Sequence, residues 1–572
     1  MMRRRIQRRS PQAADELPAG LHPVLRRVYL NRGIGTAADT DLSLSRLLPF
    51  HTLKGIDQAV ELLCEALRRQ WHVCVIGDYD ADGATSTALV VSLLRQFGLA
   101  QVSYLVPDRF RYGYGLTPEI VALARLRRPD LLITVDNGIA SVEGVAAARA
   151  AGMRVLITDH HLPGKVLPQA DAIVNPNQPG CDFPSKALAG VGVAFYLMSA
   201  LRARLRADGQ GQGPSLVGWL DLVALGTVAD VVSLDHNNRI LVEQGLRRLR
   251  AGRARPGIQA LLRVAGRDVT LATSSDLGYA VAPRLNAAGR LDDMGIGIEC
   301  LLSDDEDRAL QQARRLDQLN RERRALQQQM QEGALADLAG QLDAGELPVG
   351  LCVYDPQWHQ GVTGPVAGRL KEHYHRPVVA FAPAEPGLLK GSGRSVAGFH
   401  LRDALDAIAT RNPGLITKFG GHAMAAGLSL ETARLDEFRH AFDREARRWL
   451  DASALDGVIE SDGELAPAEI SLALAEALLG AGPWGQGFPE PLFDGAFEVL
   501  ERRIVGERHL KLHLRPLAGG APLAGIAFGS VAGAEPGQRI RAAYRLGIND
   551  YAGRRCVEAV VEYFEPEQPG AV

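Results

Sequence analysis

Between residues 71 and 158, short apolar runs alternate with longer Ala- and Leu-rich stretches. This alternation constrains the fold more than any other feature of the chain, because strands separated by helices form βαβ units and build a parallel sheet. The predicted strands are residues 71–76, 102–106, 131–135 and 154–158, and the predicted helices are 85–97, 118–126 and 142–151. The sequence therefore predicts an α/β protein whose first large domain holds a parallel sheet.

The 572-residue chain is long enough for several domains. Five parts are expected, from changes in composition and pattern along the chain. They are a helical lead-in (1–65), the parallel-sheet domain (70–235), a helical connector (236–345), a second α/β domain (346–450) and a small antiparallel barrel (460–572). The barrel is expected because its short strands are broken by Gly and Pro.

Residues 303–342 contain no proline and are rich in Gln and Arg. This composition predicts one long amphipathic helix that joins two domains. Its apolar stripe would consist of Leu316, Leu319, Leu326 and Met330. Ser303, with Glu306 three positions later, predicts a capping box at the start of this helix.

Composition excludes several classes of protein. The six cysteines form no CxxC pair, which disfavours a zinc site or a disulfide framework and fits a reducing cytoplasm. The basic start is followed by prolines and acids instead of the apolar run of a signal peptide. The longest uncharged apolar stretch, 187–201, is shorter than the ~20 residues of a membrane span, so a buried helix is expected there and no membrane contact. The net charge is −2, so any DNA contact must come from local basic patches.

An acidic motif, Gly77-Asp78-Tyr79-Asp80-Ala81-Asp82-Gly83, follows the first predicted strand. In extended backbone, the two-residue spacing would put all three carboxylates on one side. Carboxylates crowded in this way repel one another unless divalent cations neutralise them. A solvated acidic turn is the alternative, but an apolar strand aimed at three acids argues against it. A calcium loop would need a Glu at its twelfth position, which is missing.

Two further polar motifs follow later strands: Asp136-Asn137-Gly138 and Asp159-His160-His161. Ligands of parallel sheets bind outside the carboxyl ends of the strands, so these motifs and the acidic motif are expected to meet at one edge. Asp221 is a fourth candidate, because it stands in the apolar stretch 219–225, where a buried carboxylate needs a partner or a metal. Asp230 has a similar but weaker case.

Carboxylates with one imidazole suit Mn²⁺ or Mg²⁺ better than zinc or copper. Two such ions with a bridging carboxylate would activate a water and neutralise charge on a phosphoryl group. The sequence contains no nucleophile elbow, Cys-His pair or P-loop that would indicate another chemistry. These observations predict metal-dependent hydrolysis of a phosphate ester.

The motifs resemble the DHH phosphoesterase superfamily, named for the triplet at 159–161. The acidic motif, the Asp136 turn and the triplet occur in family order. The Gly-rich block 391–395, the GGH at 420–422 and the AAG at 425–427 are similar to the family's second domain, DHHA1. Three stretches resemble the RecJ family in particular: 221–230 (DLVALGTVAD), 283–290 (PRLNAAGR) and 358–369 (WHQGVTGPVAGR). The barrel is similar to the RecJ OB-fold domain, although Phe488 stands where relatives often have Asn; that departure is expected at the barrel's edge.

The resemblance implies roles for individual residues. The implied metal ligands are Asp80, Asp82, Asp136, His160 and Asp221, with Asp78 joining through a water. Asp136 would bridge the two ions. His161 would contact the scissile phosphate or protonate the leaving group, and Asp159 would orient a histidine. The residues expected to hold DNA phosphates are Arg284, Arg290, Ser392, Arg394 and His422.

The implied activity is 5′→3′ degradation of single-stranded DNA to mononucleotides, in DNA repair and recombination, with single-strand binding protein and a helicase as partners. A DHH phosphodiesterase of short oligonucleotides or cyclic dinucleotides is the alternative, but such an enzyme would lack the linker helix and the barrel. A non-enzymatic replication scaffold related to Cdc45 is also conceivable. Loss of metal ligands would mark that case, and every acidic and histidine position is intact here.

Overall fold

The computed structural model describes residues 4–108, 111–211, 213–343, 347–451, 453–507, 509–529, 531, 533–551 and 554–567; of 340–343, 453, 551 and 554 it describes the backbone alone. The chain forms two compact units. One comprises residues 8–319 and 460–572, and the other is built mainly of residues 320–459. Each unit is described by itself.

The first unit contains the parallel sheet that the sequence predicts. Its strands are β2 (Val73–Gly77), β3 (Val102–Leu105), β4 (Leu131–Val135), β5 (Arg154–Thr158) and β6 (Ala172–Val174), in the order β3-β2-β4-β5-β6, and all neighbours pair in parallel. Strands β2 and β4 are buried along their whole length. The chain reverses its direction across the sheet between β3 and β4, which makes the carboxyl ends of β2 and β4 the expected place for a ligand.

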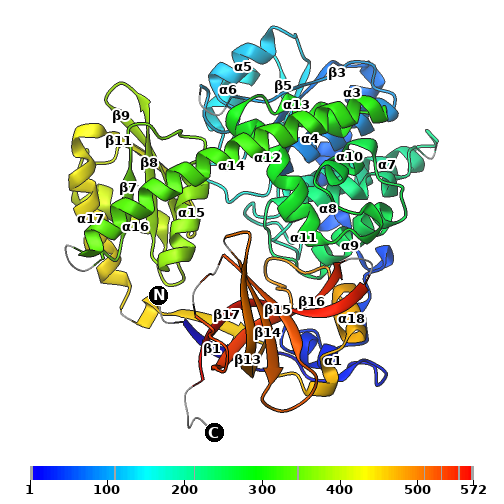
Figure 1. The fold of residues 1–572 in the computed structure, drawn as a ribbon. Coiled ribbons are helices and arrows are strands. Elements are labelled where there is room, and N and C mark those ends of the chain that lie inside the picture. The colour runs from blue at the N-terminus through cyan, green and yellow to red at the C-terminus, as the bar shows by residue number, and fades with distance from the viewer. Residues whose placement is uncertain are drawn as a thin grey trace. The chain divides into compact units, whose positions relative to one another are not determined.

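Helices connect and cover the strands (Figure 1). They are α3 (Ile56–Arg69), α4 (Ala81–Gln96), α5 (Pro118–Arg125), α6 (Val142–Ala150) and α7 (Gly190–Ala207). Helix α7 includes most of the apolar stretch 187–201 and is buried along most of its length, as expected. Among the described residues, none of the helices combines the length and apolarity that a membrane span needs.

The helical connector follows the sheet. Helix α8 (Leu220–Ala229) precedes it, and the connector contains α9 (His236–Arg250), α10 (Pro256–Val264), α12 (Ala282–Leu291), α13 (Gly295–Leu302) and the long helix α14 (Glu306–Asp343). The apolar stripe of α14 is confirmed, because Leu316, Leu319 and Met330 are buried. The predicted cap is wrong: Asp305, not Ser303, accepts a hydrogen bond from the backbone N–H of Arg308, at 2.7 Å.

The second unit holds a mixed sheet in the order β10-β11-β9-β8-β7. Its strands are β7 (Leu351–Tyr354), β8 (Val378–Glu385), β9 (Leu388–Arg394), β10 (Lys418–Gly421) and β11 (Ala425–Glu431). Only the β7–β8 pair among them is parallel. Helices α15 (Thr363–Tyr374), α16 (Leu401–Arg411) and α17 (Leu435–Trp449) complete the α/β pattern.

A closed five-stranded barrel ends the chain, in the order β13-β14-β15-β17-β16. Its strands are β13 (Phe493–Val505), β14 (His509–Pro516), β15 (Leu523–Phe528), β16 (Arg539–Tyr551) and β17 (Arg554–Pro566). The expectation of an all-antiparallel barrel is wrong, because β15 and β17 pair in parallel and close it.

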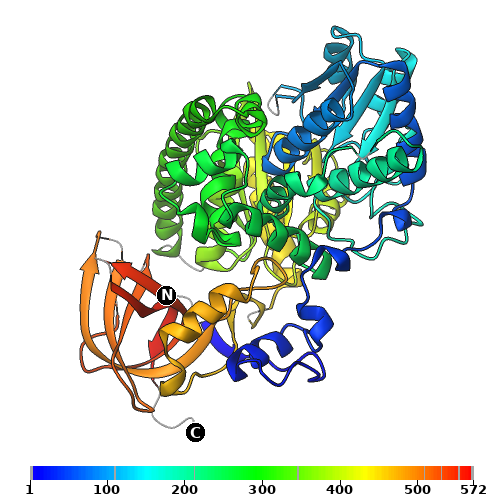
Figure 2. The ribbon, with the colours of Figure 1, turned by 90° about the vertical axis from the view of Figure 1, so that its right-hand side faces the viewer.

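The N-terminal lead-in packs beside the C-terminal part of the chain (Figure 2). Besides the expected helices, among them α1 (Pro23–Leu30), it contains an unexpected strand, β1 (Arg4–Arg8), which pairs with β12 (Gly457–Ser461). Arg32 forms a fully buried ion pair with Asp462 at 2.7 Å. The hydroxyl of Tyr29 donates to the carbonyl of Ala481, just after α18 (Leu472–Gly480). The lead-in from residue 8 onward and the C-terminal part from residue 460 therefore belong to one unit.

Candidate metal centre

The acidic motif lies on the turn between β2 and α4. The strand ends at Gly77, and Asp78, Asp80 and Asp82 then follow a strand-to-helix turn. Asp80 is the N-cap of α4, and its Oδ1 accepts hydrogen bonds from the N–H groups of Asp82 and Gly83 at 2.9 and 3.0 Å. The expected extended geometry is therefore wrong for Asp82, which sits in the first turn of the helix.

The second and third motifs come from the ends of β4 and β5. Asp136 adopts the left-handed conformation, with φ of 61°. Its Oδ1 lies 3.1 Å from Nε2 of His160, and the same nitrogen lies 3.5 Å from Oδ2 of Asp230. Parallel pairing of β2, β4 and β5 brings all three motifs to one edge, as the sequence predicts.

The ligand atoms form three overlapping groups, each with its atoms within 4.8 Å of one another. The groups are Asp136 with His160 and His161, Asp82 with His160 and Asp230, and Asp78 with Asp80 and Asp136. Asp136 and His160 each belong to two groups. A carboxylate and an imidazole shared in this way suit two neighbouring cations better than one.

Asp221 does not join this cluster, so its expected role as a ligand is wrong. It lies at the start of α8, where its carboxylate accepts the N–H of Arg255 at 2.8 Å and lies 3.4 Å from the Arg255 guanidinium. Asp230, the C-cap of the same helix, contacts His160 instead. An acidic residue in an apolar stretch of sequence predicts that the buried carboxylate has a partner but does not identify it. The partner of Asp221 is Arg255.

The carboxylates fit divalent cations. Burial, followed by the charge of Asp80, raises the pKa of Asp82 to about 7. Burial and the charge of Asp82 raise the pKa values of Asp136 and Asp230 well above the usual range. Among the described residues nothing donates a hydrogen bond to the buried Oδ1 of Asp136. Oxygen ligands with imidazole match the preference of Mn²⁺ and Mg²⁺, and these cations would offset the repulsion.

Asp159 orients His161, in line with its expected role. The Asp159 carboxylate lies 2.7 Å from Nδ1 of His161 and also accepts the N–H of Ile139, at 2.9 Å. Burial lowers the pKa of His161, but the hydrogen bond and the charge of Asp159 outweigh it and raise that pKa to about 9. His161 therefore carries a proton at neutral pH before any cation binds.

Tyr114 belongs to the site and was not singled out from the sequence. Its hydroxyl donates to the carbonyl of Asp136 at 3.0 Å and lies 3.2 Å from Nδ1 of His161. Its ring packs edge-on against His161 and Tyr79. A tyrosine in a Gly-rich turn, as in Tyr112-Gly113-Tyr114-Gly115, was the available signal.

Helix α12 braces the acidic turn. Asn286 accepts the N–H of Ala81 at 2.8 Å, and a Cβ at Gly289 would lie 1.8 Å from the carbonyl of Tyr79. Arg290, the next residue, is half-buried beside this contact. Arg284 is different: it is buried, and its guanidinium pairs with Asp317 at 2.8 Å. Its expected contact with DNA phosphate stays a prediction, since the side chain is held by the ion pair with Asp317 within the connector.

In the second unit, Ser392, Arg394 and His422 come together at the end of the sheet. Arg394 on β9 is the partner of Ala425 on β11, and Ala425 accepts the N–H of His422 at 2.8 Å. The hydroxyl of Ser392 lies 2.9 Å from that of Thr363, the first residue of α15. Within the described part of the chain no side chain caps this helix, whose positive N-terminal end therefore lies beside Ser392. Such an arrangement suits an anion.

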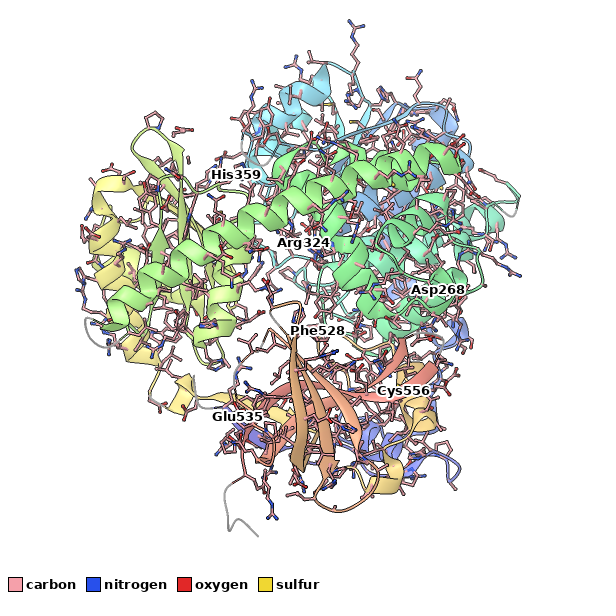
Figure 3. All side chains as sticks on the ribbon, viewed as in Figure 1. Asp268, Arg324, His359, Phe528, Glu535 and Cys556 are labelled. Atoms are coloured by element: carbon pink, nitrogen blue, oxygen red, sulfur yellow. The ribbon has the colours of Figure 1, made fainter. Side chains whose placement is uncertain are left out.

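The sequence of the barrel offers Tyr544, Tyr551 and Phe528 as possible stacking surfaces for bases. Its candidate cations for phosphates are Arg502, Arg503, Arg508, Lys511, Arg515, Arg539, Arg541 and Arg545. Tyr544 is 1% exposed in the barrel core, so it is no stacking surface. Phe528, 62% exposed at the end of β15, remains one (Figure 3). Arg508 lies outside the described residues, as does the side chain of Tyr551. Arginines of the barrel held in ion pairs include Arg502, Arg515, Arg541, Arg545 and Arg555.

Known proteins share this organisation. Residues 72–227 match the DHH family N-terminal domain, 348–448 the DHHA1 domain and 461–563 the RecJ OB domain. The single-stranded-DNA-specific exonuclease RecJ of Dickeya dadantii is 55% identical over 569 residues, covering 98% of this chain and 99% of the relative. RecJ of Escherichia coli K12 is 52% identical over 571 residues, with the same coverage.

Solved structures agree. The structure of RecJ from Thermus thermophilus in complex with Mn²⁺ superposes with a TM-score of 0.81 at 31% identity, over 99% of this chain and 80% of that one. The Mg²⁺ complex of RecJ from the same organism gives a TM-score of 0.75 at 29% identity, over 99% and 79%. On these matches and on the shared domain order, the chain belongs to the RecJ family of DHH phosphoesterases.

Proposed function

We propose that the chain is a metal-dependent exonuclease that degrades single-stranded DNA from the 5′ end and releases mononucleotides, in DNA repair and recombination. The observation that carries the proposal is the overlap of the three ligand groups at Asp136 and His160. Two Mn²⁺ or Mg²⁺ ions, when bound, would supply an activated water and neutralise charge on the scissile phosphate. RecJ of Dickeya dadantii and of Escherichia coli are named as exonucleases specific for single-stranded DNA, which supports this substrate.

The side chains of the site have separate roles in cation binding and in proton transfer. Asp78, Asp80, Asp82, Asp136, His160 and Asp230 hold the cations. His161, protonated and fixed through Nδ1 by Asp159, contacts the scissile phosphate, and its Nε2 is the atom that gives a proton to the leaving oxygen. The edge-on ring contact of Tyr114 also helps to hold the ring of His161.

The second unit would bind the 5′-terminal phosphate of the DNA strand. A terminal phosphate carries more negative charge than a diester, and the uncapped start of α15 with Ser392 and Arg394 offers donors of the kind that hold it. His422 would add a further contact. This cradle supports a preference for 5′-phosphorylated ends.

A phosphodiesterase of short oligonucleotides or cyclic dinucleotides is the alternative. It uses the same metal centre but has no need of a 38-residue linker helix or of a barrel. A polymer substrate accounts for both. A scaffold without activity is disfavoured by the complete ligand set.

The protein would act in the cytoplasm, in keeping with a DNA substrate and with cysteines that are all free. Single-strand binding protein would present the DNA, and a helicase would generate the single strand. These partners follow from the substrate, since duplex DNA must be opened before a single-strand exonuclease can act.

The test is digestion of single-stranded DNA labelled at either end, with Mn²⁺ or with EDTA. We expect a 5′ label to appear at once as mononucleotide and a 3′ label to remain on shortening strands. Early release of a 3′ label would contradict the polarity, and undiminished digestion in EDTA would contradict the metal centre. Faster cleavage of a dinucleotide than of a long strand would favour the alternative.

A further inference from the structure

A loop from the C-terminal domain lies against the backbone that follows Asp230. The carbonyl of Gln486 accepts the N–H of Leu234 at 2.7 Å. A Cβ at Gly487 would lie 2.1 Å from Oγ of Ser233, and one at Gly485 would lie 2.7 Å from Cδ1 of Leu234. The 482–489 loop therefore approaches segment 231–234 so closely that a Cβ at Gly487 or at Gly485 would push on the side chain of Ser233 or of Leu234.

Segment 231–234 begins with a strained residue. Val231 has φ of 63°, a left-handed conformation that a β-branched side chain rarely adopts. Its side chain is 62% exposed, so packing of that side chain does not hold it there. Backbone of this kind is unfavourable and persists only where its surroundings impose it.

The surroundings of Val231 are defined on both sides. Before it, Asp230 ends α8, and the N–H of Asp230 donates to the carbonyl of Gly226 at 2.9 Å. After it, Asp235 caps α9 and accepts the hydroxyl of Ser185 at 2.6 Å. Between these two ends, the side-chain amide of Asn238 donates to the carbonyl of Ser233 at 2.9 Å, and Gln486 and Gly487 contact residues 233 and 234 from the C-terminal loop.

The loop is itself rigidly supported. Phe488 is 3% exposed and stacks on Trp484 at 5.0 Å. The guanidinium of Arg239, on α9, lies 4.5 Å from the Phe488 ring. The carbonyl of Trp484 accepts the hydroxyl of Ser274 at 2.6 Å. The expectation that Phe488 lies at the barrel's edge is wrong, because it packs against the helical connector.

We propose that the 482–489 loop is a positioning element of the metal centre: by holding segment 231–234 it keeps Val231 left-handed and so keeps Asp230 beside His160. Cation affinity then depends on the C-terminal domain, whose described residues contribute no ligand to the three groups of the centre. The inference rests on the proposed function, in that Asp230 is taken to be a metal ligand. A loop that merely docks the barrel would affect stability without affecting cation affinity.

The test compares two alanine variants of the full chain. Gly487→Ala introduces the clash with Ser233. Gly537→Ala is the matched control: Gly537 lies in the same domain with φ of +82°, but a Cβ there would meet nothing within 4 Å. Both substitutions strain a left-handed glycine, and only one pushes on segment 231–234. Mn²⁺ affinity is measured from the electron paramagnetic resonance signal of free Mn²⁺, and the melting temperature is measured in EDTA.

We expect Gly487→Ala to weaken Mn²⁺ binding about tenfold, the scale seen when residues that support metal ligands are changed. Gly537→Ala should bind Mn²⁺ as the unaltered protein does. In the double variant Gly487→Ala/Ser233→Ala, which removes the clashing hydroxyl, most of the affinity should return. Equal affinities of Gly487→Ala and Gly537→Ala would overturn the proposal, as would a double variant that stays weak.

A second variant covers the case in which Gly487→Ala does not fold. Gly485→Ala meets only the flexible end of Leu234, so it should fold and weaken Mn²⁺ binding by about two- to threefold, below the range for a lost supporting residue. Unchanged binding by folded Gly485→Ala, with Gly487→Ala unfolded, would count against the proposal. If the unaltered protein itself failed to bind Mn²⁺, the proposed function would fall, whereas equal binding by all variants overturns only the role of the loop.

Discussion

Oδ1 of Asp136 and Nε2 of His160 face each other at 3.1 Å across the ends of β4 and β5. Two buried groups of a parallel sheet meet here, and each also belongs to a second ligand group. Burial and mutual repulsion raise the pKa values of Asp82, Asp136 and Asp230. The positive charge of bound divalent cations would therefore offset the repulsion between these carboxylates.

Replacing Asp136 with Ala should lower the rate of DNA hydrolysis by on the order of 10³-fold or more, because both cations lose a ligand. The fold should remain, since removing one of several repelling carboxylates relieves the metal-free site. Circular dichroism and turnover on labelled single strands measure the two effects. A folded Asp136→Ala variant with near-normal turnover would exclude the two-ion scheme.

Asp230 and Asp221 should respond differently to the same change. Asp230→Asn should weaken Mn²⁺ binding and lower activity by about 10²-fold or more, as for a lost ligand. Asp221→Asn should leave Mn²⁺ affinity nearly unchanged and lower the melting temperature, because it leaves the buried Arg255 contact without its charge. The opposite pattern would restore Asp221 as the ligand.

This pair also shows what the sequence could and could not predict. The sheet, the order of the motifs and their meeting at one edge follow from periodicity. Periodicity does not show which of Asp221 and Asp230 is the metal ligand, because one lies at the start and the other at the end of the same apolar helix. Nine residues of helix separate the two by about 13 Å. The arginine that pairs with Asp221 is Arg255, which comes from the connector.

Metal-free stability should fall as pH rises. Asp82 has a pKa of about 7 in the fold, raised by burial and by Asp80, whereas the unfolded side chain titrates near 4. Between these values the folded state holds more protons, so raising the pH costs stability until about pH 7. Mn²⁺ favours the ionised carboxylate. The difference in melting temperature between Mn²⁺ and EDTA should therefore widen from about pH 6 to about pH 8. Asp82→Asn should flatten this dependence, and a difference constant with pH in the unaltered protein would contradict it.

Asp159→Asn should move the basic limb of the pH–rate profile. The hydrogen bond and charge of Asp159 are the main causes that raise the pKa of His161 to about 9 against the effect of burial. Without that charge, the histidine loses its proton at lower pH, so kcat should begin to fall nearer to pH 7. A rate that drops equally at every pH would mean that Asp159 has only a structural role.

The barrel should contribute to binding of long strands through a small set of cations. Arg503 and Lys511 are partners across β13 and β14, where two like charges side by side are unfavourable unless something neutralises them. Among the described residues, neither is in an ion pair, whereas the nearby Arg515 is paired with Glu498 at 3.0 Å. Each phosphate contact adds about 0.7 to the slope of log affinity against log salt on single strands.

We therefore expect Arg503→Gln/Lys511→Gln to lower this slope by roughly 1.4 on long strands, the sum of two such contacts, and to weaken binding at low salt. Arg515→Gln is the control and should leave the slope nearly unchanged, because Glu498 already neutralises that side chain. Phe528→Ala should weaken binding by about 1–3 kcal/mol without changing the slope, since a ring stacks on a base instead of pairing with a phosphate. Very short oligonucleotides, which cannot reach the barrel, should respond to none of these changes. An unchanged slope in the double variant would leave the barrel as a support for the 482–489 loop, with no part in holding DNA.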